Sequence, residues 1–254
     1  MIKDSFPFKL LLKPAETFSA IAKGETGWAW PLAIFAASVL SSALLLSLAP
    51  AEFMAAASTD LPAPAGLGFT VYLATGLPGG LGFAFFFCAL LSDFSSLLKS
   101  GRLMLRAPLP LAGVGVYAVF FIARMNARAG GAAGWAVAAA ALIFSIWAAL
   151  WYRKTWLGLM KAFFAVSIFT ILADLAGGAA ALAGSTGAYK VSEYLFAILS
   201  LAWLLKAACA VTGLSGARAF SALLPAMLGA AAFAFSLLTL GVIKPEVFQL
   251  LLLM

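Results

Sequence analysis

Long apolar runs, separated by short polar or glycine-rich segments, occupy most of the chain from Trp28 onward. A membrane-spanning helix needs about 20 consecutive, mostly apolar residues, and these runs are close to that length. The pattern therefore predicts an all-α, polytopic transmembrane helix bundle with about seven spans. The predicted spans are Trp28–Ala49, Phe69–Leu98, Pro108–Ala123, Ala132–Tyr152, Ala162–Ala183, Tyr194–Thr212 and Ala219–Ile243.

Two of these runs contain residues that interrupt helices. Phe69–Leu98 includes the glycine- and proline-rich stretch Gly76–Gly80, so we expect a kink or a broken start there. Pro108–Ala123 is the weakest run, because it is short and contains two prolines and two glycines. If residues 107–152 form a re-entrant hairpin, the chain crosses the membrane five times. The strong hydrophobicity of the fourth run favours seven spans, that is, five plus an inserted pair.

The segment before the first run has a helical pattern of its own. Pro14 suits the first position of a helix, Phe18 and Ile21 lie on one face, and Gly24 is a plausible stop. We expect Pro14–Lys23 to be a short amphipathic helix on the membrane surface, or else to pack on the protein's own loops. The chain thus divides into a cytoplasmic interfacial segment (1–27), a transmembrane domain (28–243) and a short C-terminal tail (244–254).

Composition excludes whole classes of function. Hydrophobic residues make up 65% of the chain and charged residues 10%, with a mean hydropathy of +1.08. A soluble domain is about 45–50% apolar and about 25% charged, so we predict an integral membrane protein. The chain has no histidine and only nine acidic residues, which excludes histidine-based catalysis and histidine metal sites. We expect no enzyme activity, no catalytic residues, no metal and no cofactor.

The positions of the basic residues predict how the chain sits in the membrane. The net charge is +7, but Lys and Arg flank the apolar runs, which is typical of membrane proteins and not of nucleic-acid binding. With the N-terminus in the cytoplasm and seven spans, twelve of the 16 basic residues lie inside. A re-entrant hairpin raises this to fourteen. Both arrangements place the C-terminus on the far side of the membrane.

Three charged residues inside predicted spans are candidate intramembrane contacts. Asp174 lies near the middle of the fifth run, where a bare carboxylate costs at least about 2.5–3.5 kcal/mol. It serves either as a proton or cation relay or as a hydrogen-bonded tie between helices. A single acid without other polar groups at that depth favours the tie.

The other two charged residues lie at similar depths from the inner side. Lys206 is roughly 10 Å deep and Asp93 roughly 8 Å deep, at 1.5 Å per residue. An ion pair between them is one interpretation. The alternative is that Lys206 extends to the lipid headgroups.

Two short stretches resemble motifs of a known family. The first precedes an apolar run and consists of Pro14, Glu16, Thr17, Phe18 and Ile21. The second precedes the last run and consists of Trp203, then Gly213, Leu214 and Ser215, then Arg218 and Ala219. The chain resembles the Yip family, multi-span membrane proteins named for their interaction with Rab-type GTPases.

The resemblance implies a five-helix membrane domain with a cytoplasmic N-terminus, here in a bacterial-type member of the inner membrane without an assigned activity. Residues 107–152 depart from that plan. We expect a non-enzymatic scaffold or organiser whose partners are lipids, a second copy or other membrane proteins. One alternative is a small-solute or ion transporter that uses Asp174 and Lys206. Another is an accessory subunit of a larger membrane complex.

Overall fold

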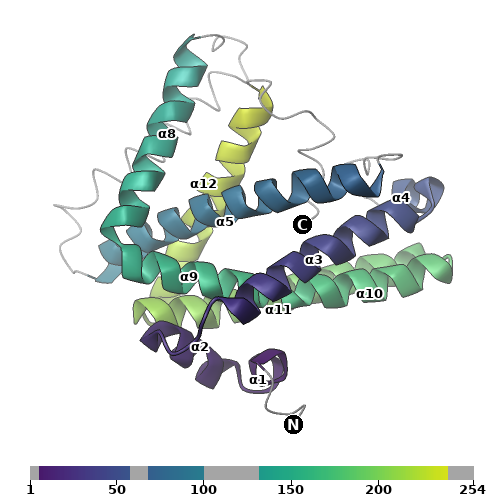
Figure 1. The fold of residues 1–254 in the computed structure, drawn as a ribbon, viewed down its shortest axis with the longest axis horizontal. Coiled ribbons are helices and arrows are strands. Elements are labelled where there is room, and N and C mark those ends of the chain that lie inside the picture. Colours follow the sequence, from purple (N-terminus) through teal and green to yellow (C-terminus); the bar gives the residue numbers. More distant parts are fainter. Residues whose placement is uncertain (1–5, 58–67, 100–131, 240–254) are drawn as a thin grey trace.

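The computed structural model describes residues 6–57, 68–99 and 132–239, and within these ranges the chain is helical without strands (Figure 1). The chain is therefore all-α. Its helices are α1 (Phe6–Leu12), α2 (Pro14–Lys23), α3 (Ala29–Leu48), α4 (Ala51–Ala57), α5 (Phe69–Lys99), α8 (Ala132–Trp151), α9 (Arg153–Val166), α10 (Ile168–Leu182), α11 (Thr186–Thr212) and α12 (Gly216–Thr239).

Five helical stretches in the described ranges are long and apolar enough to cross a membrane. They are α3, α5, the joined α9 and α10 over Arg153–Leu182, α11, and Gly216–Phe235 within α12. Within α8, Ala139–Trp151 is an apolar stretch shorter than a span. The predicted run Pro108–Ala123 lies outside the described residues. The structure thus supports a membrane protein with several spans, while the number seven stays a prediction.

Two sets of helices differ in direction. In Figure 1, α3, α5, α10 and α11 extend along the long axis of the molecule, whereas α8 and α12 rise steeply from one end of it. The long set is packed pairwise, α3 on α5, α3 on α10 and α10 on α11. The steep set packs on α5, α12 more extensively than α8. α5 is therefore the helix that joins the two sets.

α5 runs unbroken from Phe69 to Lys99 with Pro78 inside it. Of the two alternatives expected at Gly76–Gly80, a kink or a broken start, the broken start is therefore wrong, and the kink stays a prediction. In an apolar environment a helix gains little from opening, because freed backbone groups have no water to bond, and packed neighbours help it to tolerate proline. One such neighbour is Phe35 of α3, whose ring lies where a side chain at Gly80 would begin.

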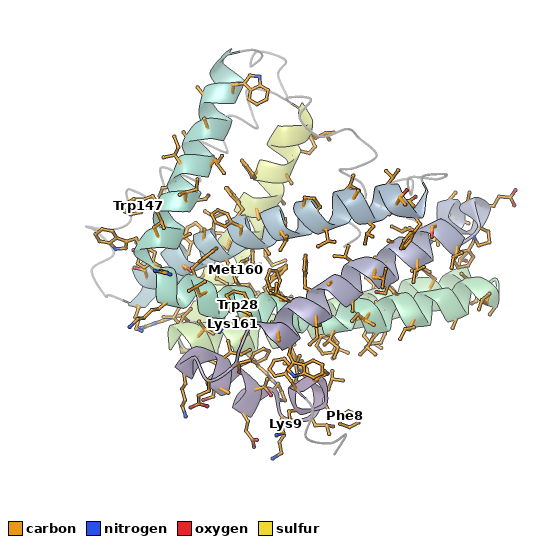
Figure 2. All side chains as sticks on the ribbon, viewed as in Figure 1. Phe8, Lys9, Trp28, Trp147, Met160 and Lys161 are labelled. Carbon is orange, nitrogen blue, oxygen red and sulfur yellow. The ribbon has the colours of Figure 1, made fainter. Side chains whose placement is uncertain are left out.

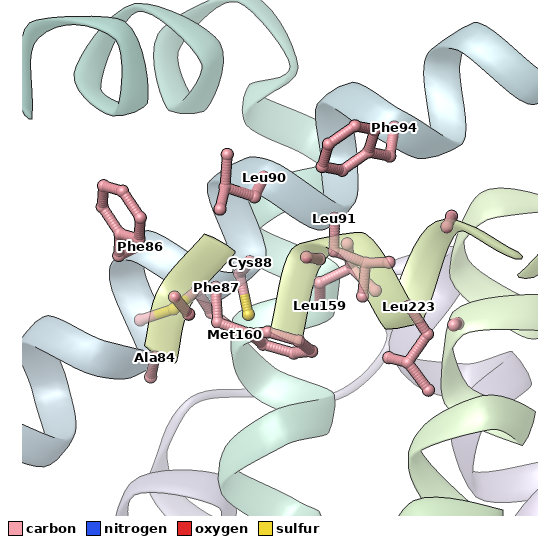
Figure 3. Close-up of a cluster of buried hydrophobic side chains, with 14 of the residues drawn as sticks. Ala84, Phe86, Phe87, Cys88, Leu90, Leu91, Phe94, Leu159, Met160 and Leu223 are labelled. Atoms are coloured by element: carbon pink, nitrogen blue, oxygen red, sulfur yellow. The ribbon is translucent and has the colours of Figure 1, made fainter. Parts of the chain in front are cut away.

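The main core lies around the second half of α5. Figure 3 shows Phe86, Phe87, Leu90 and Leu91 of this helix among side chains of α9 and α12. Cys88 is fully buried in the same cluster and is a free thiol. Aromatic and aliphatic side chains thus fill the space between the crossing helices, as dispersion-driven packing in a membrane requires.

Small residues allow α12 to approach α5 closely. The ring of Phe86 stacks on that of Phe233 with centroids 4.2 Å apart. One turn further along α5, Leu90 meets Gly229, where an added Cβ would lie only 2.6 Å from the leucine Cδ1. The face of α12 that continues this contact consists of the buried alanines Ala219, Ala222 and Ala226. A small-residue face of this kind brings helix backbones together.

Two helices begin earlier than hydrophobicity predicts. α9 begins at Arg153, nine residues ahead of the predicted run, and the only interruption before Leu182 is at Ser167. α11 begins at Thr186, eight residues ahead of the prediction, because Ser185 caps it by accepting a hydrogen bond from the Ala188 N–H at 3.3 Å. Charged residues in these first turns shorten the apolar window but leave the helix intact.

The α5–α12 contact gives a stability prediction. Replacement of Gly229 by leucine forces a side chain into Leu90 and is expected to lower the free energy of unfolding by about 1–3 kcal/mol. Gly82 on α5 is the matched control, because nothing lies within 4 Å of its added Cβ. Thermal unfolding in detergent should show a loss for Gly229→Leu and none for Gly82→Leu. Equal losses would contradict the close contact.

Candidate functional site

Asp174 connects α10 to α3. Its Oδ2 accepts hydrogen bonds from the Oγ of Ser41 at 2.5 Å and from the Oγ of Ser42 at 2.7 Å. The two serines are neighbours on α3, so both hydroxyls reach the same carboxyl oxygen. The tie between helices that we favoured for Asp174 is thus present in the structure, with hydroxyl groups as its partners.

The sequence analysis missed two further polar residues beside this tie. Tyr189 and, one turn later on α11, Glu193 lie near enough for their side chains to interact. Glu193 is also near enough for its charge to interact with that of Asp174. These residues come close because α10 and α11 pack through Gly177, where an added Cβ would lie 3.0 Å from the Tyr189 ring. Predicting α11 from Thr186 would have placed Glu193 inside a span.

Lys206 and Asp93 do not form the predicted ion pair. The Nζ of Lys206 lies 4.6 Å from the ring centroid of Trp203, one turn earlier on the same helix. Asp93 is 3% exposed, and its Oδ2 has no hydrogen-bond partner within the described part of the chain. The ion-pair interpretation is therefore wrong. Equal depth in the membrane was not sufficient to predict an ion pair. The ammonium of Lys206 has a cation–π partner on its own helix, the ring of Trp203.

The helix of the first family-like stretch packs against the helix that carries Trp203 of the second, although about 180 residues separate them. α2 carries the first stretch, with Pro14 in its first turn and Gly24 as a left-handed C-cap at φ 80°. α2 lies on α11, which carries Trp203. Phe18 is 0% exposed and Ile21 2% exposed, in one buried cluster with side chains of α9 to α11.

This packing changes the expected role of α2. The apolar face of the helix is used inside the protein, so Phe18 and Ile21 are not available to the membrane surface. The alternative that we kept open, packing on the protein itself, holds, with helices α9 and α11 in place of loops. Phe8 and Leu12 of α1 are the large apolar side chains exposed in this segment, and Phe8 points away from the bundle together with Lys9 (Figure 2).

The other motif residues have distinct surroundings. Thr17 is buried and donates to the Lys13 carbonyl, whereas Glu16 is exposed and pairs with Lys13 at 3.2 Å. Gly213 ends α11 in the left-handed region at φ 72°. In the following turn and helix, Leu214 and Ala219 are buried, whereas Ser215 and Arg218 are exposed.

Trp203 fixes the N-terminal segment to the bundle. Its indole Nε1 donates a hydrogen bond to the carbonyl of Leu10 at 3.2 Å. Its ring also makes an edge-to-face contact with Phe169 of α10, with centroids 5.2 Å apart. A second connection runs from α9, where the Lys161 Nζ donates to the Thr26 carbonyl at 2.6 Å and lies near the Trp28 ring (Figure 2).

The described residues contain no group of three His, Cys, Asp or Glu side chains arranged to hold a metal ion. The chemistry open to the Asp174 group is the exchange of hydrogen bonds and, through two neighbouring carboxyl groups, the holding of a proton.

No protein-family model, curated protein or solved structure matches the chain. The resemblance to the Yip family therefore stays a prediction, based on the short stretches that α2 and α11 bring together.

The indole hydrogen bond gives a second prediction. Trp203→Phe keeps an aromatic ring beside Phe169 but removes the donor to Leu10, a loss of about 1 kcal/mol. The backbone amides of Phe6–Leu12 should then exchange with deuterium roughly fivefold faster, because local opening becomes easier. Trp135→Phe, at an exposed position on α8, is the control. Unchanged exchange in Trp203→Phe would show that Trp203 does not hold α1.

Proposed function

We propose that the chain is a non-enzymatic integral membrane protein that acts as a scaffold or organiser of the membrane or of membrane-protein assembly. The observation that carries the proposal is the tie between Asp174 and the two serines of α3. An intramembrane acid is a functional-site candidate by default, but here its Oδ2 is engaged in joining two helices.

The outer surface supports contacts with lipids or with other membrane proteins. Large apolar side chains are exposed on several helices, among them Leu150 and Trp151 of α8, Leu182 of α10 and Ile198 of α11. In a bilayer such side chains meet lipid tails, a second copy of the chain or a different membrane protein. An accessory subunit would use the same surface, and it would be recognised by one fixed partner that co-purifies with it.

The proposed setting is the bacterial inner membrane, with the N-terminus in the cytoplasm. The bias of Lys and Arg toward that side of the predicted spans supports this orientation. Membership of the Yip family belongs to the same proposal. It rests on the two short sequence stretches, of which α2 carries the first and α11 carries Trp203 of the second.

A transporter is the second candidate, favoured by the closeness of Glu193 to Asp174. Two carboxyl groups inside an apolar bundle suit proton or cation exchange. The predicted partnership of Asp174 with Lys206 lacks support, because the former bonds to serines of α3 and the latter lies on Trp203. A path through a broken α5 also lacks support, since that helix is continuous.

Ion flux separates the two candidates. The protein is reconstituted in liposomes that contain a pH-sensitive dye, under proton or cation gradients. We expect no flux above that of empty liposomes for the wild type or for Asp174→Asn. Asp174→Asn should lower the free energy of unfolding by on the order of 1 kcal/mol, because the amide oxygen accepts weaker hydrogen bonds from the serines.

Glu52→Gln provides the control, because it removes an exposed carboxylate at the start of α4 and should leave stability unchanged. The scaffold proposal is wrong if the wild type carries a flux that is lost in Asp174→Asn while that variant stays folded.

A further inference from the structure

A polar pocket lies at the C-terminal end of α5, apart from the Asp174 group. Its volume is about 230 Å³. Side chains from α5, α9, α11 and the α8–α9 junction line it: Ser92, Ser95, Ser96, Lys99, Tyr152, Thr155 and Thr212. Six of these seven residues carry a hydroxyl group, and the seventh carries a positive charge. The lining therefore consists mainly of hydrogen-bond donors around one cation.

Ser95 is the residue that points to a ligand. It is 3% exposed, and its Oγ has no hydrogen-bond partner among the described residues. A buried hydroxyl without a partner loses the hydrogen bonds it would make in water, which costs about 1–3 kcal/mol. The neighbouring Ser92 differs, because it donates to the carbonyl of Cys88 on its own helix at 2.7 Å. Ser95 is left with an unused donor facing the pocket.

Two other groups leave donors directed at the same space. The Nζ of Lys99 donates to the Thr212 carbonyl at 3.1 Å, and an ammonium group has three donors. The hydroxyl of Tyr152 accepts from the Ser96 Oγ at 2.9 Å, so its own hydrogen is available. A tetrahedral oxyanion accepts several hydrogen bonds at once, which matches a lining with donors from α5 and from the α8–α9 junction.

One helix start beside the pocket favours an anion, and the charge of Lys99 offsets the carbonyl ends of α5 and α11 that also lie there. Thr155 lies in the first turn of α9, whose N-cap residue Tyr152 provides no side-chain cap. The first-turn N–H groups of a helix attract anions. Arg153 and Lys154 in that turn add positive charge. Asp93, the residue after Ser92 on α5, is not part of the lining.

We infer that this pocket binds a phosphate-type oxyanion, either the phosphodiester of an anionic phospholipid headgroup or free phosphate. Lys99 supplies a charge-assisted donor, Tyr152 supplies a neutral donor, and Ser95 supplies the buried donor. The pocket is separate from the Asp174 tie, so the inference goes beyond the scaffold proposal and does not depend on it.

Thermal unfolding of the purified protein tests the inference. The wild type is placed in micelles of a phosphate-free maltoside detergent, either alone, with increasing phosphatidylglycerol, or with added inorganic phosphate. Stabilisation by phosphatidylglycerol alone identifies a lipid headgroup as the source of the oxyanion, and stabilisation by inorganic phosphate identifies the free ion. Either result supports the pocket, provided that it depends on Lys99.

Lys99→Gln should weaken the apparent affinity for the stabilising anion about tenfold, because it removes the charged donor. Lys23→Gln removes the same charge from the exposed end of α2, outside the lining, and it should change the affinity less than twofold. Ser95→Ala distinguishes a binding role from misfolding. It should raise Tm in the detergent alone, because an unpartnered hydroxyl is gone, and reduce the stabilisation by the anion.

The inference is overturned if neither anion stabilises the wild type. It is equally overturned if Lys99→Gln and Ser95→Ala respond to the anion as the wild type does, since any effect would then be a nonspecific surface charge effect. Flux measurements on Asp174 variants are independent of these outcomes, so the two proposals can fail separately.

Discussion

A polar group inside an apolar bundle has to find its partner within the protein, and this constraint decides how the chain is arranged. The backbone satisfies this constraint by forming helices throughout the described ranges. Many hydroxyl groups meet it on their own helix, as when Ser92 donates to Cys88 and Thr212 to Ala208. The carboxyl group of Asp174 meets it between helices, through Ser41 and Ser42. Polar groups thereby fix which helices pack together.

The apolar residues then decide how closely the helices pack. α5 contacts α3, α8, α9 and α12, and small residues on α12 let that helix lie against Leu90 and Phe86. In the surface of the bundle, large apolar side chains remain exposed. Asp174 and several hydroxyl groups thus bond inside the bundle, whereas Asp93 and Ser95 each keep a buried oxygen without a partner among the described residues.

The sequence alone predicted those features that depend on local chemistry. The predicted helix Pro14–Lys23 has the observed bounds, because Pro14 and Gly24 mark its ends. The first span was predicted as Trp28–Ala49 and is observed as Ala29–Leu48, because the apolar run and the helix end together. The start of α11 was missed, because Lys190 and Glu193 end the apolar window although the helix continues through them.

Features that depend on tertiary contacts could not be predicted. Nothing in the order of residues shows that Ser41 and Ser42 meet Asp174, more than 130 positions away. Lys206 and Asp93 matched in depth, but depth does not specify which faces of two helices meet. The pocket around Ser95 likewise depends on four segments coming together at one end of α5. These three features depend on which helix faces pack against each other, and the sequence does not specify those faces.

A double-mutant cycle between α3 and α10 tests the central claim most directly. The free energy of unfolding is measured in detergent for the wild type, Asp174→Ala, the pair Ser41→Ala and Ser42→Ala, and the combination of all three. The account predicts a coupling energy of about 1 kcal/mol between the two helices, while Ser47→Ala, whose hydroxyl bonds only its own helix, shows no coupling to Asp174. A coupling energy of zero for the serine pair would show that Asp174 does not hold the bundle together.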